Sequence, residues 1–152
     1  MSYFYAWKYC FDGEYISMSK IKFKHIRIGK FYFSNAYSIY TGKTCIGEIN
    51  FKRQNNIFII GFILIYPEYR NKYYGYEVIE YILSHYKIKC IIGESLKSSR
   101  GFWNKCIHRY NGQRKNISIS TNCSSSFIIP KCKIDDQYFE ELLYISSDLQ
   151  NM

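Results

Sequence analysis

The segment from Ile65 to Tyr76 combines residue types that together can bind a phosphate group. Arg70 and Lys72 supply positive charge, and Gly75 lets the backbone come close to a ligand. An apolar, β-branched run precedes the segment and an amphipathic helix pattern follows it, so the chain should pass here from a strand into a helix. Unpaired N–H groups and the helix dipole favour an anion at a helix start. We therefore expect a pyrophosphate site. The single glycine excludes a dinucleotide fingerprint, and the Gly-Lys-Thr triplet further upstream lacks the earlier glycine of a Walker A loop.

A strand, a helix and a second strand must position this segment. Residues 57–66 form a strongly apolar strand in which Gly61 indicates a bulge or a close backbone approach. Residues 75–87 have apolar side chains at the spacing of one helix face, and residues 88–94 are typical of a buried strand. A connection of this kind implies a right-handed crossover, so strands 57–66 and 88–94 should be parallel neighbours.

The rest of the chain favours more strands and two more helices. Residues 2–10 and 15–33 are β-like, Ser34-Asn35 breaks the pattern, and residues 36–40 and 44–52 should form a hairpin. Further along the chain, the pattern predicts a short helix from a Ser98 or Ser99 cap to Cys106, a hairpin of residues 115–121 and 125–132, and a final helix capped by Asp135 or Asp136.

The fold class is therefore α/β (α+β), with one domain over residues 1–152. We expect a mixed, mostly antiparallel twisted sheet whose central parallel pair is flanked by helices. An acidic C-terminal helix at about 135–148 follows the last strand.

Charge is unevenly distributed along the chain. Residues 1–133 hold all 21 Lys and Arg with 7 acids, a net charge of +14, whereas residues 134–152 hold 5 acids and no Lys or Arg. A basic body favours anionic partners such as nucleotide cofactors, acidic proteins or RNA, and a solvated basic surface is the alternative. The acidic helix could cover basic surface on the body or on a second subunit, which leaves a homodimer open.

The sequence indicates a cytoplasmic protein without a metal. No apolar run is long enough to span a bilayer, and the first eight residues lack the layout of a signal peptide. The six cysteines form neither a CxxC pair nor a zinc-ligand spacing, so we expect free thiols.

Two segments resemble motifs of the GNAT family of N-acetyltransferases. The first, Ile65-x-Pro67-Glu68-Tyr69-Arg70-Asn71-Lys72-x-Tyr74-Gly75-Tyr76, is similar to the family's acetyl-CoA-binding pattern, Val-x-Pro-x-x-Arg-x-x-Gly-x-Gly. The second, Ser98-Ser99-Arg100-Gly101-Phe102-Trp103-Asn104-Lys105, resembles the family's Ala-x-x-Phe-Tyr-x-Lys segment. Together they define a CoA-binding core at about 57–110, and the hairpins on either side fit the family's strand order.

The resemblance implies acetyl-CoA as co-substrate and names the residues that would hold it. The backbone of Ile65 and Tyr66 would pair with the pantetheine arm, and amides from Arg70 to Tyr76 would hold the pyrophosphate. The two parallel strands would splay apart, with the thioester in the gap. The implied cofactor-binding residues are Ile65, Tyr66, Arg70, Asn71, Lys72, Tyr73, Tyr74, Gly75, Tyr76 and Trp103.

Two residues depart from the family pattern, and two others could carry the acid–base work. Tyr73 occupies the first glycine position of the loop, where its bulk is tolerable only if its φ is negative and its side chain points away. Trp103 stands where many members have a tyrosine that protonates the leaving thiolate. Glu94 could deprotonate the amine, or be a solvent-facing carboxylate at a strand end. Tyr110 could reach the sulfur, or belong to a surface loop.

The function that follows from the resemblance is acetyl-CoA-dependent N-acetyl transfer, directly to a primary amine. The acceptor could be a protein, a small molecule or an aminoacyl-tRNA, and the basic body makes a nucleic-acid partner reasonable. The alternative is a non-catalytic GNAT-like module that binds nucleic acid or a protein partner.

Overall fold

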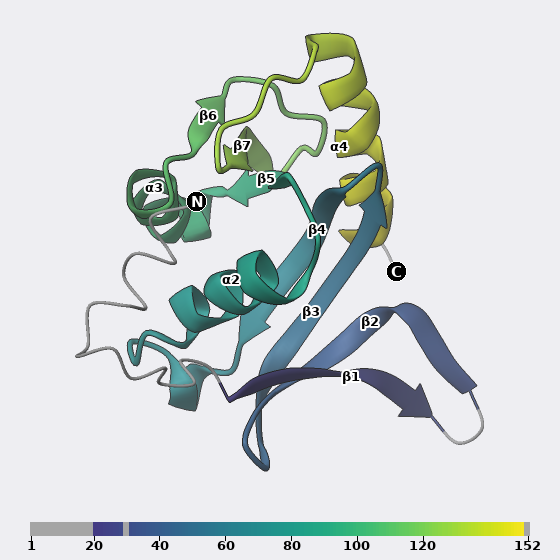
Figure 1. Cartoon of the computed structure of the whole chain (residues 1–152), viewed down its shortest axis with the longest axis vertical. Coiled ribbons are helices and arrows are strands. Elements are labelled where there is room, and N and C mark those ends of the chain that lie inside the picture. Colours follow the sequence, from purple (N-terminus) through teal and green to yellow (C-terminus); the bar gives the residue numbers. More distant parts are fainter. Residues whose placement is uncertain (1–19, 29–30, 151–152) are drawn as a thin grey trace.

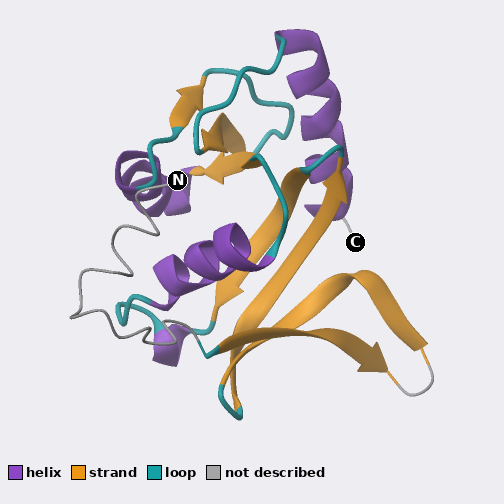
Figure 2. Cartoon of the chain, in the orientation of Figure 1, coloured by secondary structure: helices purple, strands orange, loops and turns teal. Residues whose placement is uncertain are grey.

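Seven strands form one sheet in the computed structural model, which describes residues 20–28 and 31–150 (Figures 1 and 2). Their order across the sheet is β1-β2-β3-β4-β5-β7-β6. All neighbours are antiparallel except β4 and β5, which confirms the predicted mixed sheet with one parallel pair. The strands are β1 (Ile21–Ile28), β2 (Phe31–Thr41), β3 (Thr44–Gln54), β4 (Ile57–Ile65), β5 (Cys90–Leu96), β6 (Gln113–Lys115) and β7 (Cys123–Ile129).

The first four strands form an antiparallel meander, with tight turns between β2 and β3 and between β3 and β4. The hairpin of β2 and β3 is confirmed and turns at Gly42, whose φ of +60° favours glycine. The predicted break at Ser34-Asn35 is wrong, because β2 runs through both residues and pairs with β1 on either side of them, while its pairing with β3 ends at Ala36. The strand predicted at residues 2–10 lies outside the described residues, as does the first part of the one predicted at 15–33.

The predicted strand–helix–strand unit is present as β4, α2 (Tyr74–His85) and β5. Helix α2 buries an apolar stripe, Val78, Ile79 and Ile82, against one face of the sheet. Helix α3 (Arg100–Arg109) packs on the same face through Trp103 and Cys106. This face holds the larger half of the core.

Helix α4 (Asp136–Gln150) covers the opposite face of the sheet (Figure 1). Phe139, Leu142 and Leu143 are fully buried there against the apolar residues of β4 and β5. Of the two predicted caps, Asp135 is the one observed, since its Oδ1 accepts the N–H groups of Gln137 and Tyr138 at 3.0 and 3.2 Å. The C-terminal helix is therefore part of the domain core.

After β5, Ser99 is the N-cap residue of α3, as one of the two alternatives predicted, but its hydroxyl bonds no helix N–H and instead donates to the carbonyl of Leu96. A second prediction on this segment is wrong. The strand predicted at 115–121 is mostly loop, and only the three residues of β6 pair with β7. None of the helices in the described part of the chain is long and apolar enough to cross a membrane.

Candidate functional site

The parallel strands β4 and β5 separate part-way along their length. They pair only from Ile57/Cys90 to Ile59/Ile92, yet β4 continues to Ile65 and β5 to Leu96. The sheet is therefore split beyond this point, on the side where both strands end. The N–H and C=O groups that β4 directs toward β5 lose their partner strand there.

A bulge on β4 marks the beginning of this split. The register with β3 shifts at Gly61, as the glycine predicted, and a Cβ at this position would lie 2.6 Å from the Cβ of Leu149. The hydroxyl of Ser146 on α4 donates to the carbonyl of Ile60 at 2.6 Å, which satisfies a group beside the bulge. Asn50 is 2% exposed, and its Oδ1 has no hydrogen-bond partner among the described residues. One buried acceptor is thus unsatisfied next to the bulge.

Beyond Ile65 the chain makes a single 3-10 turn, η1 (Pro67–Tyr69), and then enters α2. The first α2 hydrogen bond runs from the N–H of Glu77 to the carbonyl of Tyr73, and no side chain caps the helix start. The N–H groups of Tyr74, Gly75 and Tyr76 therefore have no acceptor within the helix. Free N–H groups and the helix dipole favour an anion at such a helix start, and the anion site itself stays a prediction.

The backbone of Ile65 and Tyr66 is already partly engaged. The N–H of Tyr66 donates to Ile46 of β3 at 2.9 Å, and the carbonyl of Ile65 accepts the Nε of Arg70 at 2.7 Å. Successive residues of a strand direct their hydrogen-bonding groups to opposite sides, so the N–H of Ile65 points toward the split. Lys72 is exposed and has no ion-pair partner among the described residues.

Tyr73 adopts a left-handed backbone conformation, with φ of +65° and ψ of 6°. Of the two conditions under which a tyrosine fits this position, the negative φ is not met, whereas the side chain is 73% exposed, as the second requires. Asn71 in the same loop also has a positive φ, of 61°. A bulky residue in this region is uncommon and strained, and such strain concentrates at functional sites.

Gly75 is required by packing within the protein. A Cβ at this position would lie 2.7 Å from the ring of Phe102 on α3. The ring of Tyr76 also packs on Phe102, with centroids 5.4 Å apart. Contact between α3 and the first turn of α2 thus fixes the direction in which the free N–H groups point.

Trp103 lies in the core, and its predicted place at the wall of a cofactor channel stays a prediction. It is 5% exposed and stacks on Phe127 of β7, with centroids 4.0 Å apart and an interplanar angle of 19°. Phe127 in turn lies 3.0 Å from where a Cβ of Gly93 would be, so the stack supports β5 at the split.

Tyr110 is buried between α2 and α3, not in a surface loop. Its hydroxyl donates to Oε1 of Glu80 at 3.0 Å, and Arg109 lies 3.5 Å from the same carboxylate. Burial, and next the Glu80 carboxylate, raise the pKa of Tyr110 far above its ordinary value. This network joins the two helices. The sequence hinted at it only through Glu80, an acid beside the apolar stripe of α2.

Glu94 lies on β5 within the split, on the face that α4 covers. It is 7% exposed, and its carboxylate accepts the N–H groups of Ile119 and Ser120 at 3.2 and 3.1 Å. The solvent-facing alternative is thus wrong. The carboxylate holds the loop between β6 and β7, while its part in chemistry stays a prediction.

Solved structures with this arrangement include acetyltransferases. A protein from Bacteroides thetaiotaomicron assigned to the GNAT acetyltransferases is 17% identical, over 83% of this chain and 74% of its own, with a TM-score of 0.52. The ribosomal-protein-S18-alanine N-acetyltransferase from Escherichia coli is 9% identical, over 76% of this chain and 97% of its own, with a TM-score of 0.51.

No family model matches the sequence, and none of the curated proteins matches it significantly. At these identities the likeness to solved structures concerns the fold. The strand order, the single parallel pair and the helices around it agree with that likeness. The chain has the GNAT fold.

Proposed function

We propose that this chain is a cytoplasmic N-acetyltransferase that moves the acetyl group of acetyl-CoA directly to a primary amine. One observation carries the proposal: an uncapped helix start lies beside the split between two parallel strands. The helix start suits a pyrophosphate, and the split gives an extended arm a strand with which to pair. Phosphate and arm are the two parts that a CoA site must hold.

The residues present fit such a cofactor. The N–H groups of Tyr74, Gly75 and Tyr76 would hold the pyrophosphate, with Lys72 as a nearby positive charge. The N–H of Ile65 would pair with the pantetheine arm, because that of Tyr66 is engaged with β3. The exposed ring of Tyr73 leaves the helix start clear. Bound there, acetyl-CoA supplies an activated acetyl group as a thioester.

Direct transfer requires that the acceptor amine be held close to the thioester. We propose that the amine binds on the face of the sheet that α4 covers. Glu94 lies on that face at the split, and the unsatisfied Oδ1 of Asn50 lies on it beside the bulge. We propose Glu94 as the group that accepts the proton of the amine. Tyr110 is the weaker candidate for the acid, because its hydroxyl is held by Glu80.

Thermal unfolding of the full chain with and without CoA tests the cofactor. A ligand that binds only the native state must raise the melting temperature, by an amount that grows with ligand concentration. We expect a clear rise at millimolar CoA, and a smaller one with pantetheine, which has the arm but no pyrophosphate, as the matched ligand. An unchanged melting temperature at that concentration contradicts the proposal.

Release of free CoA in the presence of amines separates an enzyme from a binding module. The acceptor class is open among protein, small-molecule and aminoacyl-tRNA amines, so each is offered in turn. Turnover with any of them excludes the non-catalytic alternative. That alternative has one observation in its favour, since Tyr110 and Glu94 are both engaged with groups of the protein itself. Salt-sensitive RNA retention without turnover would support it.

A further inference from the structure

The sheet opens at a second place, between β2 and β3. Their pairing ends at Ala36/Asn50, whereas β3 continues to Gln54 and pairs there only with β4. The first residues of β2 pair with β1 alone, so β2 and β3 diverge there (Figure 1). Within the described part of the chain, the side of β3 that faces β2 therefore has no neighbouring strand from residue 51 to residue 54. We call this stretch the basic edge.

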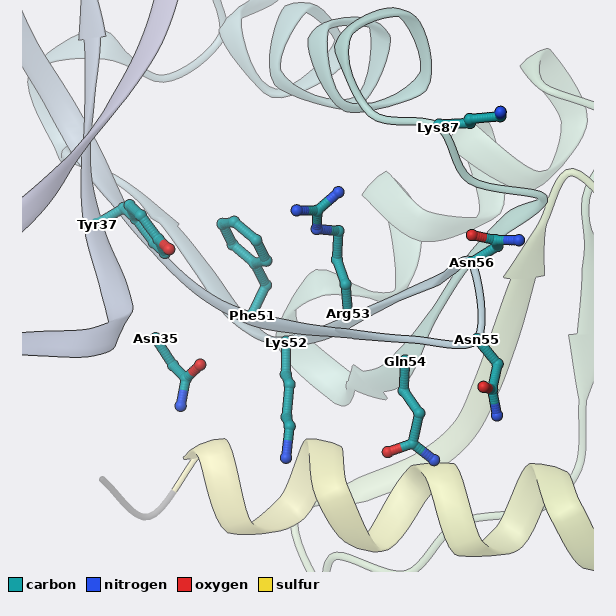
Figure 3. A pocket seen from close by; sticks show the side chains of 9 residues that line it. All are labelled: Asn35, Tyr37, Phe51, Lys52, Arg53, Gln54, Asn55, Asn56 and Lys87. Atoms are coloured by element: carbon teal, nitrogen blue, oxygen red, sulfur yellow. The ribbon is translucent and has the colours of Figure 1, made fainter.

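A hollow of about 450 Å³ lies along the basic edge (Figure 3). Among the described residues, its lining includes three cations, Lys52, Arg53 and Lys87, and no acidic residue. All three are exposed, and none has a carboxylate within ion-pair distance among the described residues. Arg53 instead lies over the ring of Tyr86, 5.0 Å from its centroid. Amide side chains complete the polar lining: Asn35, Gln54, Asn55 and Asn56.

The cations lie on both sides of one strand. Figure 3 shows Arg53 on the same side of β3 as Phe51, and Lys52 on the opposite side, toward α4. This is the alternation that a pleated strand imposes on consecutive residues. A peptide strand added at this edge would place consecutive side chains next to these cations in turn. Its backbone would pair with groups of β3 that no other strand uses.

We propose that the basic edge binds an extended acidic segment of a partner protein by strand addition. Charge complementarity selects the occupant, since three unpaired cations and no acid line the hollow. A second copy of this chain would bring a net charge of +9 and the same cations to the contact. RNA is disfavoured because it has no peptide backbone that could pair with a free strand edge. In addition, Phe51 is 5% exposed and stacked on Phe58, so its ring cannot stack on a base.

The basic edge is separate from the proposed cofactor site. The two lie toward opposite ends of β4, whose nine residues span roughly 26 Å at a rise of about 3.3 Å per step. The docking proposal does not depend on acetyl transfer. The simpler interpretation is that Lys52 and Arg53 only protect an edge strand from aggregation, and a protected edge binds no peptide.

Fluorescence anisotropy with a labelled peptide tests the proposal on the full chain. The probe has three consecutive glutamates flanked by threonine and valine. We expect saturable binding that weakens about tenfold in K52Q/R53Q/K87Q. The matched control, K105Q/K131Q/K133Q, removes the same charge from exposed lysines elsewhere and should change affinity less than about twofold. Circular dichroism of both variants verifies that they fold.

Two modified probes distinguish strand pairing from general charge attraction. N-methyl groups on alternate residues of the peptide remove the hydrogen-bond donors of one side only. One methylation phase should abolish binding and the other should leave it intact. Equal affinity for both phases overturns strand addition. So does absence of binding at millimolar peptide, or tighter binding of a single-stranded oligouridylate through the same three cations.

Discussion

Positively charged side chains lie near both ends of β4, but the backbone beside them has a different shape at each end. Beyond Ile65 the chain turns through η1 into α2, where consecutive N–H groups converge on one point. At the other end, alongside Ile57 to Ile60, the edge of β3 that holds Lys52 and Arg53 has no neighbouring strand on its β2 side among the described residues. Charge sets the sign of the ligand at both ends. The backbone sets its shape: a compact phosphate at one end and an extended chain at the other.

The largest expected effect concerns the buried aromatic packing near the proposed cofactor site, at what we call the cofactor end of β4. Trp103→Ala removes a ring that is 5% exposed and stacked on Phe127, so it should lower the free energy of unfolding by about 3–5 kcal/mol. Urea denaturation measures the loss, with Trp103→Phe as the conservative control. Peptide binding at the basic edge should persist under conditions where the variant stays folded.

The same pair of variants tests the predicted contact between Trp103 and the cofactor. If Trp103 lines the channel, Trp103→Phe will weaken CoA binding although the fold remains stable. If it only supports β5 from the core, the affinity of the folded protein for CoA will follow that of the wild type.

The next effect in size is the charge at the helix start. R70Q/K72Q removes two positive charges from the loop, and we expect CoA binding to weaken about tenfold, or about 1.4 kcal/mol. Isothermal titration calorimetry with CoA gives the affinity. Binding of the acidic peptide should stay unchanged. An equal loss for both ligands would mean that the two ends of β4 respond only to net charge, and the comparison would fail.

The backbone path near the cofactor end could be predicted from local pattern. The apolar run of β4, the bulge at Gly61 and the helix start near Gly75 each follow from nearby residues. The parallel pairing of β4 and β5 follows from the handedness of the crossover. Local propensity and tertiary structure agree there, which is why the sequence was informative.

The loop before β7 shows where local pattern fails. Ile117 and Ile119 alternate with serines as in a strand, yet they belong to a loop that packs toward α4. Side chains from other strands take its backbone groups, because Glu94 accepts two of its N–H groups and Ser126 donates to the carbonyl of Ile117. Pairing of this kind depends on residues distant in sequence.

Predictions about individual site residues failed for the same reason. The burial of Tyr110 against Glu80 depends on how α2 and α3 rotate toward each other. The basic edge depends on β2 losing its pairing with β3 near Asn35, where the sequence suggested only a break. The uncapped N–H groups of α2 depend neither on how the helices rotate nor on how β2 pairs, so they could be predicted.

A smaller effect tests whether the two ends of β4 differ in backbone strain. Both ends hold residues with positive φ: Tyr73 at 65°, and Asn55 and Asn56 at 51° and 62° in the β3–β4 turn. Asparagine tolerates this region, whereas tyrosine is strained in it. Tyr73→Gly should therefore raise the free energy of unfolding by up to about 1 kcal/mol, and Asn56→Gly should raise it less. Guanidinium denaturation of both variants measures the difference. A larger gain for Asn56→Gly would show that the loop at Tyr73 is relaxed.

The smallest effect is a pH dependence that only the cofactor end should have. Burial, and next the charge of Glu80, raise the pKa of Glu77 in the first turn of α2. Its stabilising contribution is therefore complete below the ordinary carboxyl value of 4.5 and is lost as pH rises through the raised value. A pyrophosphate bound at the helix start would raise this pKa further, so CoA binding should take up a proton and weaken with rising pH.

Glu77→Gln isolates this contribution. The variant should show a flatter CoA affinity across the same pH range, while the phosphates of CoA titrate equally with both proteins and cancel in the comparison. It should also be more stable than the wild type at neutral pH, because it has no carboxylate to desolvate. The basic edge has no acid in its lining, so its peptide affinity should be the same for both proteins at every pH. A CoA affinity that depends on pH identically in both would place the phosphate away from the first turn of α2, and the contrast between the ends of β4 would then rest on the strand edge alone.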